Sequence, residues 1–166
     1  MQKVLVVGAG GQLGQELQRT SGTDIECLPM TRAQLDIADL AVVTQCLAAV
    51  APQLVINAAA YTAVDKAESE VDAAQRGNVA GPLALAQACA QQGVRLIHIS
   101  TDFVFDGSAS QPYKPDAATA PLGEYGRSKR AGELAVQSVL PQALILRTGW
   151  VYSRYGSNFV KTMLRL

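Results

Sequence analysis

The chain has 166 residues, of which 49% are hydrophobic and 17% charged, a composition that indicates one globular domain and excludes intrinsic disorder. Fourteen basic and fourteen acidic side chains cancel to a formal net charge of zero, so we expect no nucleic acid partner. No apolar run reaches the roughly 18–20 residues of a membrane helix, so we expect no membrane partner either.

The cysteines and the amino terminus indicate a cytoplasmic protein. Cys27, Cys46 and Cys89 lie far apart and form no C-x-x-C pair, which favours buried thiols in a reducing compartment over disulfides or a zinc site. The apolar start MQKVLVVGAGG is too short for a signal peptide and has no cleavage site.

Short apolar runs alternate with longer amphipathic stretches along the chain. The short runs predict buried strands at Val4–Val7, Ile25–Leu28, Leu54–Asn57, Arg95–Ser100 and Ala143–Arg147. The longer stretches predict helices at Gln12–Arg19, Leu40–Val50, Ala67–Gln91 (weakened in its middle by Gly77, Gly81 and Pro82) and Tyr125–Val139. This alternation predicts an α/β fold of the Rossmann-like, doubly wound type, a parallel sheet with helices on both faces.

Two further segments concern the domain organisation. Phe105–Gly123 is rich in Pro, Gly, Ser and Asp, and irregular loops of that length are usually functional or mobile. Asn158–Leu166 has the composition of a helix, but Leu166 follows no capping residue. We therefore expect the chain to stop before the protein does.

Three glycines follow the first predicted strand in the pattern G-x-x-G-x-x-G. Gly8 suits the tight turn out of the strand, Gly11 would let a pyrophosphate approach the backbone, and Gly14 would let the helix pack closely on the sheet. The helix N-terminus would then face the phosphates. The spacing differs by one residue from G-x-G-x-x-G, and the alternative is a glycine-rich turn with no ligand.

The segment after the second predicted strand concerns cofactor choice. LPMTR contains no carboxylate for the ribose hydroxyls of NAD, whereas Arg32 could pair with a 2′-phosphate. This favours NADPH as the cofactor, although NADH stays an open alternative. The alternative interpretation of Arg32 is a solvated surface charge. Asp36 and Ile37 could flank an adenine, through its amine and its ring face.

Tyr125 and Lys129 are four residues apart, which places them on one face of a helix. We expect the ammonium group to lower the pKa of the phenol and make it a proton donor. Most Y-x-x-x-K pairs are surface pairs, but this one follows a strand that ends in Ser100 and Thr101. Either hydroxyl could support an oxyanion. Asn57 to Ala60 end the third strand with small residues that leave room for a cofactor, so three strand ends indicate one crevice.

These motifs together resemble the extended short-chain dehydrogenase/reductase family. More narrowly, GAGGQLGQEL, NAAAYTAVDKAE, STDFVFDG, YGRSK, RTGWVY and NFVKTMLRL resemble its dTDP-4-dehydrorhamnose reductase branch along essentially the whole chain. The resemblance implies an oxidoreductase that reduces the C4 ketone of dTDP-4-dehydro-L-rhamnose to dTDP-L-rhamnose with a nicotinamide cofactor. That reaction serves dTDP-rhamnose and lipopolysaccharide biosynthesis.

The resemblance also implies roles for individual residues. Tyr125 would donate the proton, Lys129 would be its partner, and Thr101 rather than Ser100 would complete the triad. Thr101, Asp102 and Trp150 would contact the sugar nucleotide. The pyrophosphate would meet the backbone of Gly11, Gln12 and Leu13. The resemblance and the motifs together give one set of cofactor-binding residues: Gly8, Gly11, Gln12, Leu13, Gly14, Arg32, Asp36, Ile37, Ala59, Ala60, Tyr61, Thr62, Tyr125 and Lys129.

The chain departs from the family pattern in two ways. Phe103 stands where the family usually has tyrosine, which removes a hydroxyl near the substrate. Relatives continue for nearly twice this length, and their C-terminal part closes over the nucleotide. The resemblance therefore implies that residues 1–166 form a dinucleotide-binding (Rossmann) domain that carries the catalytic triad, and that the substrate domain is largely absent because it lies beyond residue 166. Glu16 matches a position that in some relatives ligates a divalent ion between subunits. We assign no metal to this chain and leave Mg²⁺, like a homodimer, to the full-length protein.

Several alternatives stay open. The chain could be a regulatory subunit that binds NADP without turnover, or an epimerase that recycles tightly held NAD. His98 lies among apolar residues and is better interpreted as a core histidine than as a catalytic one. Trp150 and Tyr152 alternate with Val151, which fits a half-buried edge as well as a substrate wall.

Overall fold

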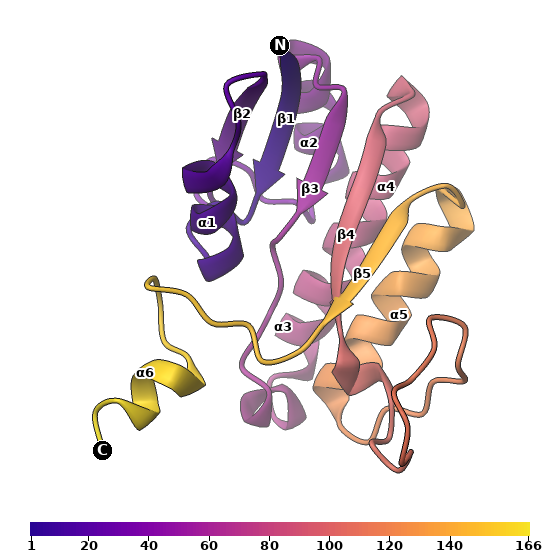
Figure 1. Cartoon of the computed structure of the whole chain (residues 1–166). Helices are drawn as coiled ribbons and strands as arrows, with labels where there is room; N and C mark the ends of the chain where they lie inside the picture. The colour runs from indigo at the N-terminus through magenta and orange to yellow at the C-terminus, as the bar shows by residue number, and fades with distance from the viewer.

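The computed structural model describes residues 1–166. Five strands form one parallel sheet in the order β2-β1-β3-β4-β5 (Figure 1). The strands are β1 (Gln2–Val7), β2 (Ile25–Met30), β3 (Leu54–Asn57), β4 (Arg95–Thr101) and β5 (Leu144–Thr148). The predicted Rossmann-like α/β fold is confirmed, and each predicted strand lies within a residue or two of its observed position.

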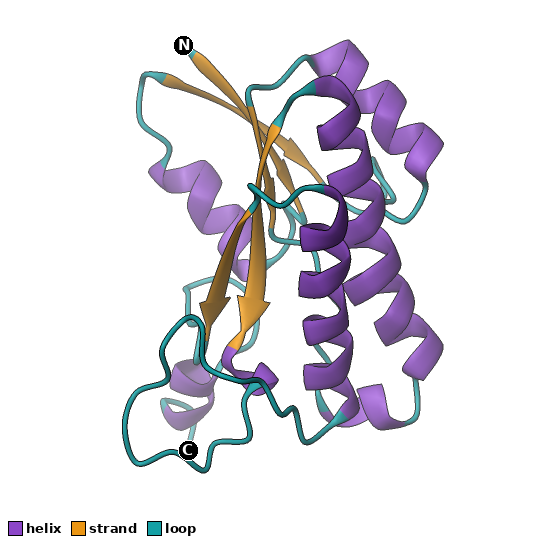
Figure 2. Ribbon diagram, turned by 90° about the vertical axis from the view of Figure 1, so that its right-hand side faces the viewer, coloured by secondary structure: helices purple, strands orange, loops and turns teal.

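Helices cover the two faces of the sheet unequally. They are α1 (Gln12–Thr20), α2 (Leu40–Val50), α3 (Val71–Gln75), α4 (Gly81–Gln92), α5 (Glu124–Val139) and α6 (Phe159–Met163), with short turns η1 (Asp65–Glu68), η2 (Arg76–Ala80) and η3 (Asp102–Val104). Figure 2 shows the sheet edge-on, with α2, α4 and α5 stacked on one side and α1 alone on the other. None of these helices combines the length and apolarity needed to cross a lipid bilayer.

The main hydrophobic core lies between the sheet and the stack of α2, α4 and α5. Leu5 and Val7 of β1 point into this core, and Val4 and Val6 are also buried, on the opposite face. A strand that is buried on both faces explains the unbroken apolar run at the start of the chain. At the far edge of the sheet, β5 differs. Its Leu144 is 52% exposed, because α1 packs against β1 and β2 and leaves the same face of β5 uncovered.

The helix expected over residues 67–91 is present only in interrupted form. The 3-10 turn η1 comes first, then α3, and η2 is a π-helical turn that leads directly into α4. Pro82 at the start of α4 has no N–H to donate to the preceding turn, so the helix widens just before it. The glycines and proline that weakened the sequence pattern therefore mark a real break in hydrogen bonding.

The last segment of the chain passes along the carboxyl ends of the strands to reach α6 (Figure 1). The Asn158 side chain donates to Gln12 Oε1 at 2.9 Å, and the Ser153 hydroxyl donates to Glu16 Oε1 at 2.9 Å. Asn158 also caps α6 by accepting from the backbone N–H of Lys161. The helix predicted in this region is confirmed, and residues 149–158 are tied to α1.

The unequal cover of the sheet gives a stability test with a matched control. We expect Leu5→Ala to lower the free energy of unfolding by about 2–5 kcal/mol, because it empties a fully buried site. Leu144→Ala, the same change on a half-exposed strand position, should cost under about 1 kcal/mol. Urea unfolding followed by circular dichroism measures both, and equal losses would contradict this account of the core.

Candidate active site

A cleft of about 1050 Å³ lies along the carboxyl ends of the strands, the edge where open parallel sheets bind ligands. The β1–α1 turn forms one end of it, and Tyr125 and Lys129 of α5 lie at the other. Residues predicted to bind cofactor or substrate line this cleft, namely Gly8, Gly11, Gln12, Leu13, Arg32, Asp36, Ile37, Ala59, Ala60, Tyr61, Thr62, Thr101, Asp102, Tyr125, Lys129 and Trp150. Gly14 is absent from the lining.

Gly8 and Gly14 are required by close backbone contacts. Gly8 has φ +77°, and a side chain there would place its Cβ 2.6 Å from the Cα of Ala59. A Cβ at Gly14 would lie 2.7 Å from the Cα of Ala9. The turn therefore packs against β3 through Gly8, and α1 packs against the turn through Gly14, as the glycine pattern predicted.

The N-terminus of α1 faces the cleft without a capping side chain. Gly11 holds the N-cap position, and no acidic residue occupies the first turn. The N–H of Gly11 donates to the carbonyl of Gly8 at 3.0 Å. The approach of a pyrophosphate to the backbone of Gly11 stays a prediction. The N–H groups of Gln12 and Leu13, at the positive end of the helix dipole, are better placed to bind an anion.

A charge pair lies at the end of the cleft next to β2. Asp36 accepts a hydrogen bond from Arg76 Nη2 at 2.6 Å and another from the N–H of Ala38 at 3.1 Å. The Arg76 hydrogen bond is the main reason that the pKa of Asp36 is lower than usual. Asp36 was predicted as a free acceptor for an adenine amine, and the structure gives it a guanidinium partner from η2. Arg32 lines the same end of the cleft.

A buried asparagine that the sequence analysis did not single out holds the middle of the cleft. Asn78 Oδ1 accepts from the N–H of Tyr61 at 2.9 Å, and its amide group donates to the Tyr61 carbonyl and to the hydroxyl of Ser128. Tyr61 also donates from its hydroxyl to Glu70 at 2.7 Å. These bonds tie the segment after β3 to α5. The local sequence QRGNVAG contains other polar residues and gave no signal that singled out this asparagine.

Three side chains meet at the other end of the cleft. Tyr125 and Lys129 lie one turn apart on α5, and the Thr101 hydroxyl at the end of β4 interacts with the Tyr125 phenol. The Lys129 side chain is almost fully buried and donates to the carbonyl of Ile99 at 2.7 Å. Because side chains alternate along a strand, Ser100 points to the opposite face of β4. The geometry therefore favours Thr101 over Ser100 as the hydroxyl beside the phenol.

The expected effect of Lys129 on Tyr125 is not seen. Burial raises the pKa of Tyr125, the Thr101 hydroxyl lowers it, and the Asp102 carboxylate raises it again. The prediction of a lowered pKa is wrong because Lys129 directs its ammonium group to a backbone carbonyl. Burial also lowers the pKa of Lys129 to about 8. Tyr125 is thus fully protonated at neutral pH and has a proton to give.

His98 is confirmed as a core histidine. It is fully buried on β4, where the amide of Asn57 lies 3.0 Å from its Nδ1. The Asn57 oxygen accepts from the N–H of Ala59, which assigns the amide nitrogen to the histidine side. Burial lowers the pKa of His98 to about 3, so the ring is neutral and is far from poised to exchange a proton.

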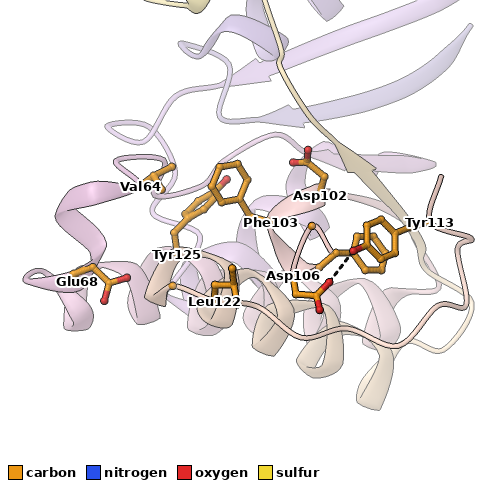
Figure 3. Close-up of a pocket in the computed structure, with 11 residues that line it drawn as sticks. Val64, Glu68, Asp102, Phe103, Asp106, Tyr113, Leu122 and Tyr125 are labelled. Carbon is orange, nitrogen blue, oxygen red and sulfur yellow. Dashed lines mark hydrogen bonds between the residues drawn. The ribbon is translucent and has the colours of Figure 1, made fainter. Parts of the chain in front are cut away.

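A second pocket of about 410 Å³ adjoins Tyr125 on the side away from the glycine turn (Figure 3). Phe103 lines both this pocket and the cleft, and it meets the Tyr125 ring edge-on, with ring centroids 5.6 Å apart. The loop over residues 105–123 forms its far wall, where Tyr113 donates to Asp106 and stacks on Phe105. The irregular loop singled out from composition therefore borders the catalytic end of the cleft.

Two other predicted positions differ from expectation. Trp150 is 78% exposed and has φ +55°, so the half-buried edge is wrong and its side chain forms an open wall of the cleft, edge-on to Phe159. Tyr152 is also exposed.

Glu16 pairs with Arg19 at 2.7 Å and accepts from Ser153, and no cluster of potential metal ligands includes it.

Comparison with known proteins gives concordant matches. Residues 1–166 match the family described as RmlD substrate binding domain. The chain is 48% identical over 164 residues to a dTDP-4-dehydrorhamnose reductase of Sinorhizobium fredii, and 44% identical over 168 residues to one of Aggregatibacter actinomycetemcomitans. The alignments cover 99% and 100% of this chain, but only 55% and 57% of the two relatives, so the chain spans little more than half of their length.

Solved structures agree with this match. The dTDP-4-dehydrorhamnose reductase of Bacillus anthracis in complex with NADP superposes with a TM-score of 0.96 at 40% identity, covering 99% of this chain and 59% of that one. The UDP-glucose 4-epimerase of Brucella ovis in complex with NAD superposes with a TM-score of 0.77 at 24% identity, covering 87% of this chain and 50% of that one, a likeness of fold alone.

The burial of Lys129 predicts a stability cost. Because its ammonium group is desolvated, we expect Lys129→Met to raise the free energy of unfolding at pH 7 by about 1–3 kcal/mol. Lys129 loses its proton near pH 8 when folded and near 10.5 when unfolded, so between these values the unfolded chain binds more protons and wild-type stability rises with pH.

Urea unfolding at pH 7 and pH 10 tests this. The advantage of Lys129→Met over the wild-type chain should shrink at the higher pH, where the folded wild-type chain has already lost its buried charge. A variant less stable than wild type at both pH values would show that Lys129 stabilises the fold.

Proposed function

Because the chain belongs to the RmlD family of dTDP-4-dehydrorhamnose reductases, we propose that it carries the cofactor-binding and catalytic part of an NADPH-dependent enzyme. This enzyme would reduce the C4 keto group of dTDP-4-dehydro-L-rhamnose to give dTDP-L-rhamnose for cell-surface polysaccharide. The observation that carries the proposal is a single cleft with a glycine-rich turn at one end and Tyr125, Lys129 and Thr101 at the other.

The residues of the cleft fit a nicotinamide dinucleotide. The glycine turn and the N-terminus of α1 would hold the pyrophosphate, and Arg32 would pair with the 2′-phosphate that distinguishes NADPH from NADH. Lys129 has three N–H donors and gives one to Ile99, which leaves two for the ribose hydroxyls next to the nicotinamide. Bound NADPH would supply the hydride that reduces the carbonyl carbon.

The three side chains at the catalytic end divide the remaining work. Thr101 would donate a hydrogen bond to the carbonyl oxygen and support the negative charge that develops on it. Tyr125 would give its phenolic proton to the same oxygen, which turns the ketone into an alcohol. Its raised pKa keeps that proton in place until the oxygen becomes basic. The open walls at Trp150 and Asp102 would contact the sugar nucleotide.

A second candidate is a regulatory subunit that binds NADP without turnover. The complete set of Tyr125, Lys129 and Thr101 argues against it, and a turnover assay distinguishes the two candidates. The main proposal also includes a dTDP-sugar as the bound molecule, the cytoplasm as the compartment and a homodimer as the assembly of the longer protein. They are supported by the family match alone.

The role of Arg32 can be tested by cofactor binding. We expect Arg32→Ala to weaken NADPH binding by about 10–100-fold, since a charge-assisted contact to phosphate is lost, and to change NADH binding less than threefold. Titration of the fluorescence of the reduced nicotinamide measures both. Arg95→Ala, at the opposite end of β4, is the control and should leave both affinities unchanged. Equal losses of affinity for NADPH and NADH would show that Arg32 does not contact the 2′-phosphate.

The role of Tyr125 can be tested by turnover. We expect Tyr125→Phe to slow NADPH oxidation by dTDP-4-dehydro-L-rhamnose at least about 100-fold, because the general acid is lost, with little change in NADPH affinity. Absorbance at the reduced-cofactor band gives the rate, and Tyr152→Phe, an exposed tyrosine, is the matched control. Near-normal turnover in Tyr125→Phe would exclude the role. A wild-type chain that binds NADPH but never oxidises it would instead support the regulatory candidate.

A further inference from the structure

A buried ion cluster lies on α5 directly behind the catalytic end of the cleft. The Glu133 side chain has no exposed surface. Arg147 of β5 donates to both of its oxygens, at 2.8 Å from Nε and 2.7 Å from Nη2, and Arg130 of α5 donates at 2.8 Å. A buried carboxylate is costly unless it is paired and fully hydrogen-bonded, and here it has three charged hydrogen bonds.

Glu133 lies on the same face of α5 as Lys129. The two residues are four positions apart, which places them one helical turn apart on that face. They form no ion pair, since Glu133 is hydrogen-bonded to Arg147 and Arg130 and Lys129 to the Ile99 carbonyl. Lys129 is also almost fully buried, and its own hydrogen-bond partner, the Ile99 carbonyl, is neutral. An ammonium ion in that position needs a negative charge nearby to offset its desolvation.

The other groups around Lys129 do not supply that charge. Tyr125, one turn earlier on α5, is a neutral phenol, and His98 of β4 is a neutral imidazole. Arg147 of β5 and Arg130 of α5 are cations, and both are hydrogen-bonded to Glu133. The Asp102 carboxylate acts on Tyr125 from the end of β4, but of the two carboxylates only Glu133 raises the pKa of Lys129, against the effect of burial.

We propose that Glu133 is a positioning residue of this site, which supplies the negative charge that keeps buried Lys129 an ammonium ion at the cofactor cleft. The inference rests on the proposed function, because it gives Lys129 its contact with the ribose of NADPH. Glu133 lines neither the cleft nor the second pocket, so its effect on the cofactor would pass through Lys129.

Arg147 connects this charge to the second pocket. Besides its bonds to Glu133, it donates to the carbonyl of Pro115 at 3.1 Å, and its guanidinium lies 5.0 Å from the centre of the Phe105 ring. Pro115 and Phe105 both belong to the loop that forms the far wall of the pocket beside Tyr125. The pair of Glu133 and Arg147 therefore holds one helix, one strand and one loop around the catalytic end.

Two substitutions separate the charge of Glu133 from its shape. Glu133→Gln keeps the size and removes the charge, whereas Glu133→Asp keeps the charge and shortens the side chain. The affinity of the 166-residue chain for NADPH should be measured from pH 6 to 9.5. In the wild-type chain we expect the affinity to fall as Lys129 loses its proton, near pH 8 or above.

The two variants should then differ in their pH profiles. In Glu133→Gln the pH at which the NADPH affinity falls should be lower by at least about one unit, because the uncompensated ammonium ion loses its proton more easily. In Glu133→Asp it should stay within about 0.3 unit of the wild-type value, since the charge is kept. An unmoved profile in Glu133→Gln, or an equal loss at every pH in both variants, would overturn the inference in favour of a purely structural role.

A stability cycle decides the matter if Glu133→Gln folds poorly. The loss in the urea midpoint caused by Glu133→Gln should be smaller in a Lys129→Met background, where no buried ammonium ion is left uncompensated. Equal losses in both backgrounds would overturn the inference. A wild-type chain that fails to bind NADPH at any pH would overturn the proposed function, while this cycle would still test the pairing of Glu133 with Lys129.

Discussion

The parallel direction of all five strands is the constraint on which the rest of the structure depends. Each strand must be followed by a crossover, so every carboxyl end lies at the same edge and every connection begins there. Gly8, Ala59 and Thr101, which are far apart in sequence, meet at this edge because each follows or ends a strand. A cleft at this edge is therefore a consequence of strand direction, and the side chains at the strand ends decide what it can bind.

The proposed chemistry would require charge in a place where charge is unfavourable. Lys129 is almost fully buried on a helix that also packs against the core, and Glu133 is buried one turn further on. A core made only of apolar residues would be simpler to stabilise, as buried ion pairs often contribute little net stability. Their presence behind Tyr125 is best understood as a cost that the fold accepts for the site.

The cover of the molecule is less complete than its core. Leu144 on β5 and Trp150 beside the cleft are both more than half exposed, although each is a large apolar side chain. Leu144 belongs to β5 and Trp150 to the segment between β5 and α6, and Figure 1 shows that segment leaving the sheet to reach α6. Figure 2 shows α1 as the only long helix on one side of the sheet. The relatives that the chain matches are almost twice as long, and the chain covers 55% of one and 59% of another.

The sequence by itself determined the local features: the strands, the positive φ of Gly8, the shared face of Tyr125 and Lys129 and the burial of His98. Each of these follows from strand alternation, helical spacing or the absence of a side chain, which act over a few residues. Only the tertiary structure decided the pairing of Asp36 with Arg76, of Glu133 with Arg147 and of Asn78 with Tyr61. It also raised the pKa of Tyr125, against expectation. These outcomes depend on burial and on contacts between elements 14 to 40 residues apart, and no short-range pattern encodes such contacts.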